Sequence, residues 1–354
     1  MKKANLILLM ASMICACAGQ NNTYYLHGSF SNSRSSKVYL ISAGKVIDTA
    51  TVDKDRQFSF NGTATTPPIL AEVADAPSTR AANNTCKVIL EPGLLTVYPL
   101  EGTSDYYVTG SKSNDLITGM ANKSMELDNY FIQHKDEDDV YEKVDEQWNS
   151  YLEQNTRKYT DNMFGLVCLD ELKYELDPND TRKMLDAFDP DIRNTDTWKQ
   201  LDQYNRKMLP TAPGNKYIEF SQTDLNGNLI STKDVLATPG VKYVLIDFWA
   251  SWCGPCMREV PYLKETYSKY FDKGFQILGV SLDRSRNPWL MAIENNQMNW
   301  IHVSELNYWD NSVAKKYAVS SIPSNFLVDA STGMIIATNL RGKKLEKKIA
   351  ELLK

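Results

Sequence analysis

Cysteine and histidine are both scarce in this chain, with 6 cysteines and 3 histidines among 354 residues. So few cysteines exclude a scaffold held together by disulfides, and the fold must rest on hydrophobic cores. At roughly 100 to 200 residues per domain, the length predicts two or three domains. Lysine and arginine form no basic block and the net charge is −5, which argues against nucleic acid as the principal partner.

Apolar runs of transmembrane length are also lacking. The run at residues 6–18, which follows two lysines, is shorter than the about 20 residues that span a bilayer, but it suits a signal-peptide core. Ile-Cys-Ala-Cys at 14–17 resembles a bacterial lipobox. We expect a lipoprotein-type signal peptide over 1–16, a lipid anchor on Cys17, a tether over 17–22 and export to the periplasmic side of a bacterial membrane. The alternative is ordinary signal cleavage after Ala18, two residues later, without lipidation.

Residues 23–112 alternate short strand-like runs with turn residues at a spacing of about 8 to 12 residues, which predicts an all-β sandwich or barrel. Phe58 and Phe60 share one face and are expected in its core. No catalytic cluster is found in this region. The runs are 24–30, 37–41, 46–52, 57–60, 69–73, 87–90, 94–98 and 106–108.

Residues 113–209 form a central acidic segment. Between positions 115 and 208 there are 22 acidic and 12 basic side chains, a net charge of −10. Apolar residues recur at helical spacing from Val140 to Leu152, which predicts helices with a solvated acidic face. Asp-Pro pairs at 177–178 and 189–190 predict helix boundaries, and the proline-containing segment 209–214 predicts a linker.

Residues 210–354 alternate strand and helix patterns, which predicts an α/β domain. The run 243–249 is almost continuously apolar, as in a strand buried on both faces. The other expected elements are a hairpin over 220–230, helices over 255–271, 288–297 and 344–353, and strands over 276–282, 325–328 and 334–338.

The motif Cys253-Gly254-Pro255-Cys256 stands where the buried strand ends and a helix begins. The free N–H groups and positive dipole end of a helix stabilise a thiolate, so we expect Cys253 to be the nucleophile. Pro255 fits the first turn of the helix, where its missing N–H costs nothing. The spacing lets Cys256 attack a mixed disulfide on Cys253 and resolve it.

Residues 244–256 closely resemble the thioredoxin active-site segment, and Ser321-Ile322-Pro323 resembles the cis-proline loop of that family. Residues 212–354 resemble the TlpA/ResA branch, with a hairpin before the core strand, Glu-Val-Pro at 259–261, and 70 positions between Cys253 and Pro323 that leave room for the insert of that branch. The resemblance implies a thioredoxin fold and thiol-disulfide oxidoreductase activity. The N-terminal β-region is similar to an uncharacterised domain that precedes thioredoxin folds in some bacterial lipoproteins.

The family implies a proton acceptor beneath the cysteines, and Asp247 occupies that place, six positions before Cys253. A carboxylate in an apolar strand has a raised pKa and can take the proton of Cys256. Glu259 is a second candidate, because the branch has a glutamate there. The alternatives are a purely structural polar residue for Asp247 and a first-turn glutamate that stabilises the helix dipole for Glu259.

The family also implies a substrate-binding surface around the motif. Pro323 in cis would face the disulfide, with the Ile322 backbone free to pair with an extended client segment. Trp252, Gly254 and Pro255 complete this predicted surface, with Trp252 shielding one side. Trp249 is expected in the core.

These features predict a membrane-anchored oxidoreductase that reduces or exchanges disulfides in exported client proteins and is kept reduced by a membrane thiol carrier. One alternative is a binding lipoprotein whose redox domain is secondary. A thiol peroxidase is disfavoured, because Ala250 and Ile246 stand where peroxiredoxins need Thr or Ser and Pro. The non-catalytic alternative is that the motif forms a purely structural disulfide.

No cofactor and no metal site are expected. Two thiolates need two further ligands, the chain offers only His27, His134 and His302, and Met257 excludes a haem-attachment motif. The remaining cysteines, Cys86 and Cys168, are interpreted as free and buried, with a disulfide between them as the alternative.

Overall fold

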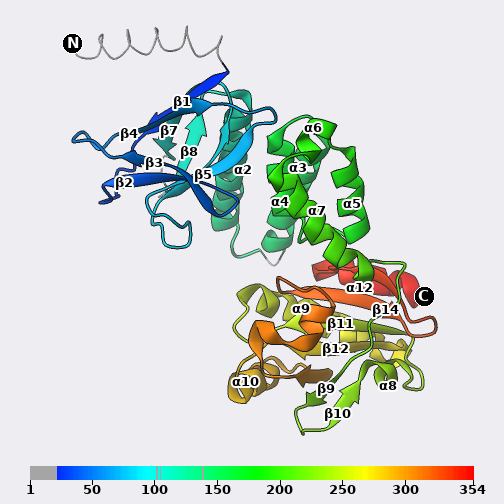
Figure 1. The fold of residues 1–354 in the computed structure, drawn as a ribbon. Helices are drawn as coiled ribbons and strands as arrows, with labels where there is room; N and C mark the ends of the chain where they lie inside the picture. The colour runs from blue at the N-terminus through cyan, green and yellow to red at the C-terminus, as the bar shows by residue number, and fades with distance from the viewer. Residues whose placement is uncertain (1–21, 101–102, 104, 138) are drawn as a thin grey trace. The chain divides into compact units, whose positions relative to one another are not determined.

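The computed structural model describes residues 22–100, 103, 105–137 and 139–354 (Figure 1). The predicted signal peptide and Cys17 lie outside the described residues. The chain forms two compact units. Among the described residues, the first unit combines those up to 172 with 184–201, and the second combines 173–183 with 202–354. The three-part division expected from the sequence stays a prediction. Residues of its central segment contribute to both units.

Two β-sheets with one shared core make up the N-terminal part of the first unit, as predicted for a sandwich. Alternate side chains of both sheets point into this core, and Phe58 and Phe60 are 3% and 2% exposed there. The strands run β4-β1-β7-β8 in one sheet and β3-β2-β5-β6 in the other. Their bounds are β1 Thr23–Gly28, β2 Lys37–Ser42, β3 Lys45–Thr51, β4 Phe58–Thr63, β5 Ile69–Ala74, β6 Thr85–Leu90, β7 Gly93–Pro99 and β8 Tyr106–Thr109. All eight predicted strands are confirmed.

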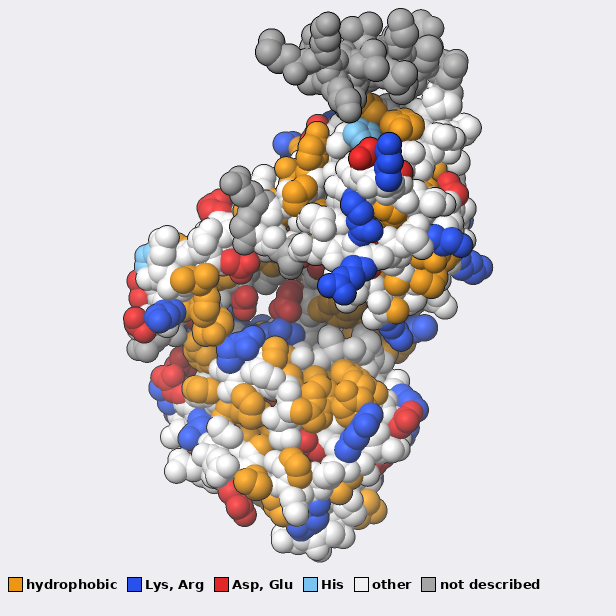
Figure 2. All heavy atoms as spheres, turned by 90° about the vertical axis from the view of Figure 1, so that its left-hand side faces the viewer, with side chains coloured by type: hydrophobic (Ala, Val, Ile, Leu, Met, Phe, Trp, Pro, Cys, Tyr) orange, Lys and Arg blue, Asp and Glu red, His pale blue; other side chains and the backbone are white. Residues whose placement is uncertain are grey.

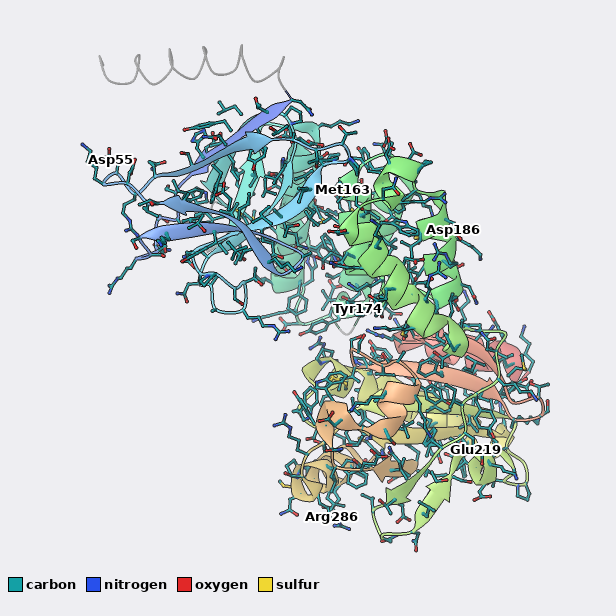
Figure 3. The ribbon with its side chains drawn as sticks, viewed as in Figure 1. Asp55, Met163, Tyr174, Asp186, Glu219 and Arg286 are labelled. Atoms are coloured by element: carbon teal, nitrogen blue, oxygen red, sulfur yellow. A yellow bond between two sulfur atoms is a disulfide. The ribbon has the colours of Figure 1, made fainter. Side chains whose placement is uncertain are left out.

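Helices follow the sandwich in the same unit: α2 Lys112–Gln133, α3 Val140–Lys158 and α4 Met163–Leu172. The predicted apolar stripe of α3 is confirmed at Val140 and Leu152, each 1% exposed. Helix α4 begins at Met163, labelled in Figure 3, and is buried over almost its whole length. Asn114 of α2 donates to the carbonyl of Ile89 and accepts from its N–H, at 2.8 and 2.9 Å, which ties α2 to β6.

Cys86 and Cys168 are both free and buried, as expected from the sequence. Burial raises the pKa of each thiol to about 12, because the interior disfavours the thiolate. Neither is therefore a reactive thiol in the folded chain.

The second unit is built on a sheet in which seven strands of the described chain run in the order β10-β9-β13-β12-β11-β14-β15. The central strands β11, β12 and β13 are parallel, and β14 is antiparallel to β11. The bounds are β9 Ser221–Asp224, β10 Leu229–Ser231, β11 Tyr243–Trp249, β12 Phe275–Ser281, β13 Ile301–Ser304, β14 Ser324–Asp329 and β15 Met334–Thr338. Strand β11 is buried over six of its seven residues, which explains its continuous apolar run.

The helices of this part are α8 Thr232–Leu236, α9 Gly254–Tyr270, α10 Arg286–Asn296, α11 Ser312–Lys316 and α12 Gly342–Leu352, with the short helical turns η2 Phe271–Lys273 and η3 Tyr308–Asp310. Helices α9 and α12 pack against one another. This arrangement confirms the predicted thioredoxin-type α/β fold.

Along the chain, the sandwich and this fold are separated by α5 Pro178–Ala187, α6 Pro190–Arg193, α7 Asp196–Met208 and η1 Leu209–Thr211. Both predicted boundaries are confirmed, since α5 and α6 begin at the prolines. The predicted linker at 209–214 is wrong. Thr211 and Ala212 are buried, and the N–H of Gly214 donates to the carbonyl of Ile335 at 2.9 Å, so this segment is an integral part of the second unit.

On the face in Figure 2, Lys and Arg side chains stand in separate small groups among acidic and apolar ones. Within the described ranges, no helix combines the length and apolarity needed to cross a bilayer.

Candidate active site

The cysteine pair stands at the start of α9, directly after the loop that leaves β11. Cys253 is the N-cap residue and is joined to Cys256 by a disulfide. The N–H of Cys256 donates to Sγ of Cys253 at 3.1 Å, and Pro255 lies in the first turn. When the pair is reduced, the same N–H group and the helix dipole favour the thiolate form of Cys253. The local sequence thus builds a nucleophile with a second thiol beside it.

Asp247 lies in the middle of β11 and is 3% exposed. Burial, assisted by the negative charge of Glu259, raises the pKa of Asp247 to about 7, and the positive charge of Arg341 opposes this shift. In the sheet, Asp247 pairs with Gly279 of β12 and Asn325 of β14. A carboxyl group with this pKa can both accept and release a proton near neutral pH.

Glu259 lies in the second turn of α9, since no acidic residue stands in the first turn. The interpretation of Glu259 as a first-turn glutamate is therefore wrong. Its Oε2 accepts a hydrogen bond from the N–H of Gly342 at 2.8 Å, where α12 begins. Glu259 thus joins the active-site helix to α12 and adds negative charge near Asp247.

The loop before β14 faces the disulfide. The Ile322–Pro323 peptide is cis, as the resemblance implies. The carbonyl oxygen of Ile322 lies 3.6 Å from Sγ of Cys253. The structure therefore brings together the cysteines and the cis-proline loop, which are 69 residues apart along the chain.

Trp249 is 1% exposed, which confirms its predicted place in the core, whereas Trp252 is 45% exposed beside Cys253. The Trp252 ring centroid lies 5.0 Å from that of Tyr308 and 6.2 Å from that of Trp309. The guanidinium of Arg284 lies 4.0 Å from the Tyr308 ring centroid. Tyr308, Trp309 and Arg284 were not predicted at this site, because no local sequence pattern places them beside Trp252.

Asp283 is a further residue at the site that was not predicted from the sequence. Its carboxylate accepts hydrogen bonds from the hydroxyl of Ser251 at 2.5 Å, the N–H of Ser251 at 3.1 Å and the hydroxyl of Ser281 at 2.7 Å. These bonds hold the loop that leads to Cys253. A signal was available, because Asp283 follows β12, and the carboxyl ends of adjacent parallel strands meet at one edge of a sheet.

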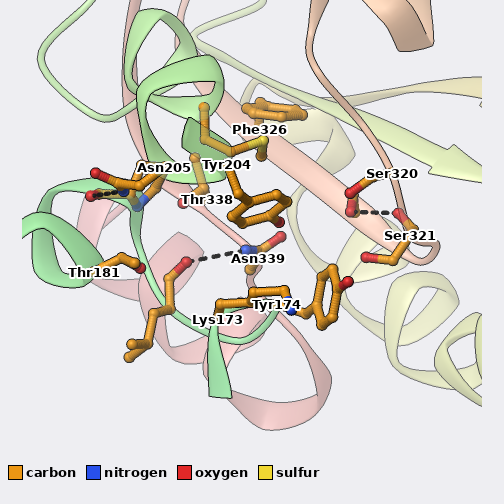
Figure 4. Close-up of a pocket in the computed structure, with 14 residues that line it drawn as sticks. Lys173, Tyr174, Thr181, Tyr204, Asn205, Ser320, Ser321, Phe326, Thr338 and Asn339 are labelled. Atoms are coloured by element: carbon orange, nitrogen blue, oxygen red, sulfur yellow. Dashed lines mark hydrogen bonds between the residues drawn. The ribbon is translucent and has the colours of Figure 1, made fainter. Parts of the chain in front are cut away.

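A pocket adjoins the cis-proline loop within the second unit (Figure 4). It is lined by Ser320 and Ser321 of that loop, by Asn339 after β15, and by Tyr174 and Tyr204 from the helical segments. The two tyrosine ring centroids lie 5.7 Å apart. Residues outside the predicted 210–354 domain therefore lie next to the loop that faces the disulfide.

Comparison with known proteins links both ends of the chain to described families. A family described as thioredoxin-like matches residues 240–335, and a domain of unknown function, DUF4369, matches residues 24–117. The thiol-disulfide oxidoreductase ResA of Bacillus thuringiensis subsp. konkukian is 30% identical over 146 residues, which are 40% of this chain and 76% of ResA.

Solved structures are similar to a comparable share of the chain. The thioredoxin domain of a thiol-disulfide oxidoreductase from Bacteroides vulgatus is 36% identical, covers 40% of this chain and 99% of its own, and has a TM-score of 0.37. A thiol-disulfide oxidoreductase from Bacteroides fragilis is 32% identical, with coverages of 39% and 100% and a TM-score of 0.36.

Proposed function

The chain belongs to the thioredoxin-like thiol-disulfide oxidoreductases, and on this premise we propose that Cys253 and Cys256 reduce or exchange disulfides in client proteins. The observation that carries the proposal is a cysteine pair at a helix N-terminus, with the carbonyl of Ile322 3.6 Å from Sγ of Cys253. The N-terminal region has no assigned activity.

The reaction begins with the reduced pair. The Cys253 thiolate attacks one sulfur of a client disulfide, forms a mixed disulfide and releases the other client sulfur as a thiolate. The Cys256 thiolate then attacks Sγ of Cys253 and releases the second client sulfur. Two electrons pass to the client, and the chain is left with the Cys253–Cys256 disulfide.

Resolution requires that Cys256 lose its proton. We assign Asp247 as the acceptor, because its pKa of about 7 leaves a substantial fraction ionised at neutral pH. Glu259 supports this role by its charge. The proton then passes from Asp247 to solvent or to the departing client thiolate.

The client segment is held in an extended conformation against the cis-proline loop. The Ile322 backbone pairs with it, as in strand addition to a sheet edge. Trp252 covers one side of the site. Gly254, where an added Cβ would meet only the Arg258 side chain at 3.9 Å, and Pro255 leave space in front of Cys253.

The Gly-Pro dipeptide between the cysteines favours a reducing direction. Thioredoxin has a potential of about −270 mV, against about −120 mV for the oxidant DsbA. We expect the Cys253–Cys256 couple to lie below about −200 mV when equilibrated with glutathione or dithiothreitol and quantified by mass. The Cys86→Ser variant is the matched control. A potential above roughly −150 mV would reverse the proposed direction of electron flow.

We further propose that the chain is exported and held on the periplasmic side of a bacterial membrane by a lipid on Cys17. In that position a membrane thiol carrier can return the pair to its reduced form. The support is the lipobox-like segment at 14–17. Cys17→Ala should move the protein from the membrane pellet to the soluble fraction on cell fractionation, whereas Cys15→Ala should leave it in the pellet. Equal distribution of the two variants would contradict lipidation at Cys17.

A further inference from the structure

The loop 339–341 between β15 and α12 is held by several side-chain hydrogen bonds. The side chain of Asn325 donates to the carbonyl of Leu340 at 2.7 Å and accepts from its N–H at 2.9 Å. Asn325 is the cross-strand neighbour of Asp247. The loop is therefore anchored beside the buried carboxyl group.

Arg341, the last residue of this loop and the N-cap residue of α12, reaches two other parts of the unit. Its Nη2 donates to the carbonyl of Pro323 at 2.8 Å, immediately after the cis peptide bond. Its Nη1 pairs with Oε1 of Glu175 at 3.0 Å, and both side chains are only partly exposed, at 25% and 33%. A guanidinium can make both contacts at once because its donors form a rigid planar fork.

Two charged groups act on Asp247 from the elements packed against it. Glu259 of α9 raises the pKa of Asp247, and Arg341 lowers it. The N–H of Gly342 also donates to Glu259 at 2.8 Å. Arg341 and the adjoining Gly342 therefore contact the carbonyl of Pro323 and the carboxylate of Glu259. Arg341 is also the only cation among the named influences on the pKa of Asp247.

Glu175 lies far outside the region that matches the thioredoxin-like family, which spans 240–335. Its segment, 173–183, belongs to the second unit by its contacts. The neighbouring carbonyl of Leu176 accepts a hydrogen bond from the side chain of Asn339 at 3.3 Å, drawn as a dashed line in Figure 4. Two successive residues of segment 173–183, Glu175 and Leu176, therefore hold the loop 339–341 at Arg341 and Asn339.

We propose that Arg341 is a positioning residue for the disulfide exchange, which fixes the cis-proline loop through Pro323 and neutralises part of the charge around Asp247, and that Glu175 holds it in place. The inference rests on the proposed function, since it concerns the same site. It makes a segment outside the thioredoxin-like region necessary for full activity of the cysteine pair.

The test uses the full chain with Arg341→Gln, Arg341→Lys and Glu175→Gln, and a disulfide-containing peptide as client. Arg341→Gln should raise KM about fivefold, because a hydrogen bond that positions the loop is lost. It should also move the midpoint of the pH–rate profile upward by about one pH unit, because the cation beside Asp247 is removed. Arg341→Lys should restore the midpoint of the pH–rate profile, because the positive charge is kept. It should not restore KM, since an ammonium group lacks the planar, forked donors of a guanidinium. Glu175→Gln should raise KM about twofold and leave kcat unchanged.

Lys183→Gln is the matched control, because Lys183 pairs with Asp180 at 2.8 Å in the same segment on an exposed surface. It should behave as the original chain. A second readout needs no client: the carbon-13 NMR titration of the Asp247 carboxyl should shift upward in Arg341→Gln. Failure of the original chain to exchange disulfides would refute the proposed function alone. An unchanged Asp247 titration together with an unchanged KM would refute the role of Arg341.

Discussion

Client proteins are expected to remain covalently attached to Cys253 when Cys256 is replaced by serine. In Cys256→Ser the first attack is intact, because Cys253 keeps its place at the N-terminus of α9. The second attack is lost, since serine cannot reduce the mixed disulfide. Non-reducing gels of cells that carry the variant should show adducts that disappear on reduction, and mass spectrometry should place the link at Cys253.

Cys253→Ser should remove the activity altogether, with turnover reduced by at least about a thousandfold, because no nucleophile remains in reach of the client. It should also form no adducts. Cys86→Ser and Cys168→Ser are the controls, since both thiols are buried and their pKa values are raised to about 12. Adducts that form equally well in Cys253→Ser would assign the nucleophile elsewhere, and the absence of any adduct in Cys256→Ser would favour the binding lipoprotein interpretation.

Replacing Asp247 with asparagine is expected to slow the resolving step by about a hundredfold at pH 7 to 8. In the original chain the rate should rise with pH through about 7, the pKa to which burial raises Asp247, because only the ionised carboxyl accepts the proton of Cys256. The variant should lose this limb of the profile. Stopped-flow measurement of client release across pH 5 to 9 checks both effects.

The same substitution should increase stability at alkaline pH. The pKa of Asp247 is raised from 3.8 to about 7, so between these values the native chain keeps a proton that the unfolded chain releases. The free energy of unfolding therefore falls as the pH rises through this window, and the penalty is complete above about 7. The neutral amide of asparagine carries no such penalty, so Asp247→Asn should be more stable at pH 8 by up to about 4 kcal/mol and little changed below pH 4.

Glu265→Gln provides the control for both effects, because Glu265 is an exposed carboxylate on α9, paired with Lys269 at 2.7 Å. It should change neither the pH profile nor the denaturant midpoint. If Asp247→Asn kept the original pH profile, the proton of Cys256 would have to leave by another route. If Asp247→Asn were less stable than the original chain at pH 8, the ionised Asp247 carboxylate would stabilise the fold instead of destabilising it.

Local sequence patterns predicted many of the secondary-structure elements. The eight strands of the sandwich were predicted because alternation of apolar and polar residues is a property of neighbours in sequence. The same holds for the start of α9, where the cysteine motif directly follows a buried strand. The cis-proline loop was predicted from a family resemblance, since nothing in its composition alone places it 3.6 Å from Cys253.

The linker prediction at 209–214 was wrong for a physical reason. Proline and glycine indicate a chain that is neither helix nor strand, but they do not say whether such a chain is exposed. Here Ala212 is fully buried, and the Gly214 N–H bonds to Ile335 of β15. Irregular backbone can be part of a core when its polar groups find partners.

By itself, then, the sequence determined the cysteine pair at the junction of a buried strand and a helix, because this pattern involves residues within a few positions of one another. The family resemblance added the thioredoxin-type fold and the role expected of Asp247. Only the tertiary structure decided what surrounds them. Arg341 meets Glu175 across 166 positions and Glu259 meets Gly342 across 83, contacts that no local pattern encodes. Hydrogen bonds and charges act over a few ångströms in space, whatever the separation along the chain, so the groups that tune the site appear only once the chain is folded.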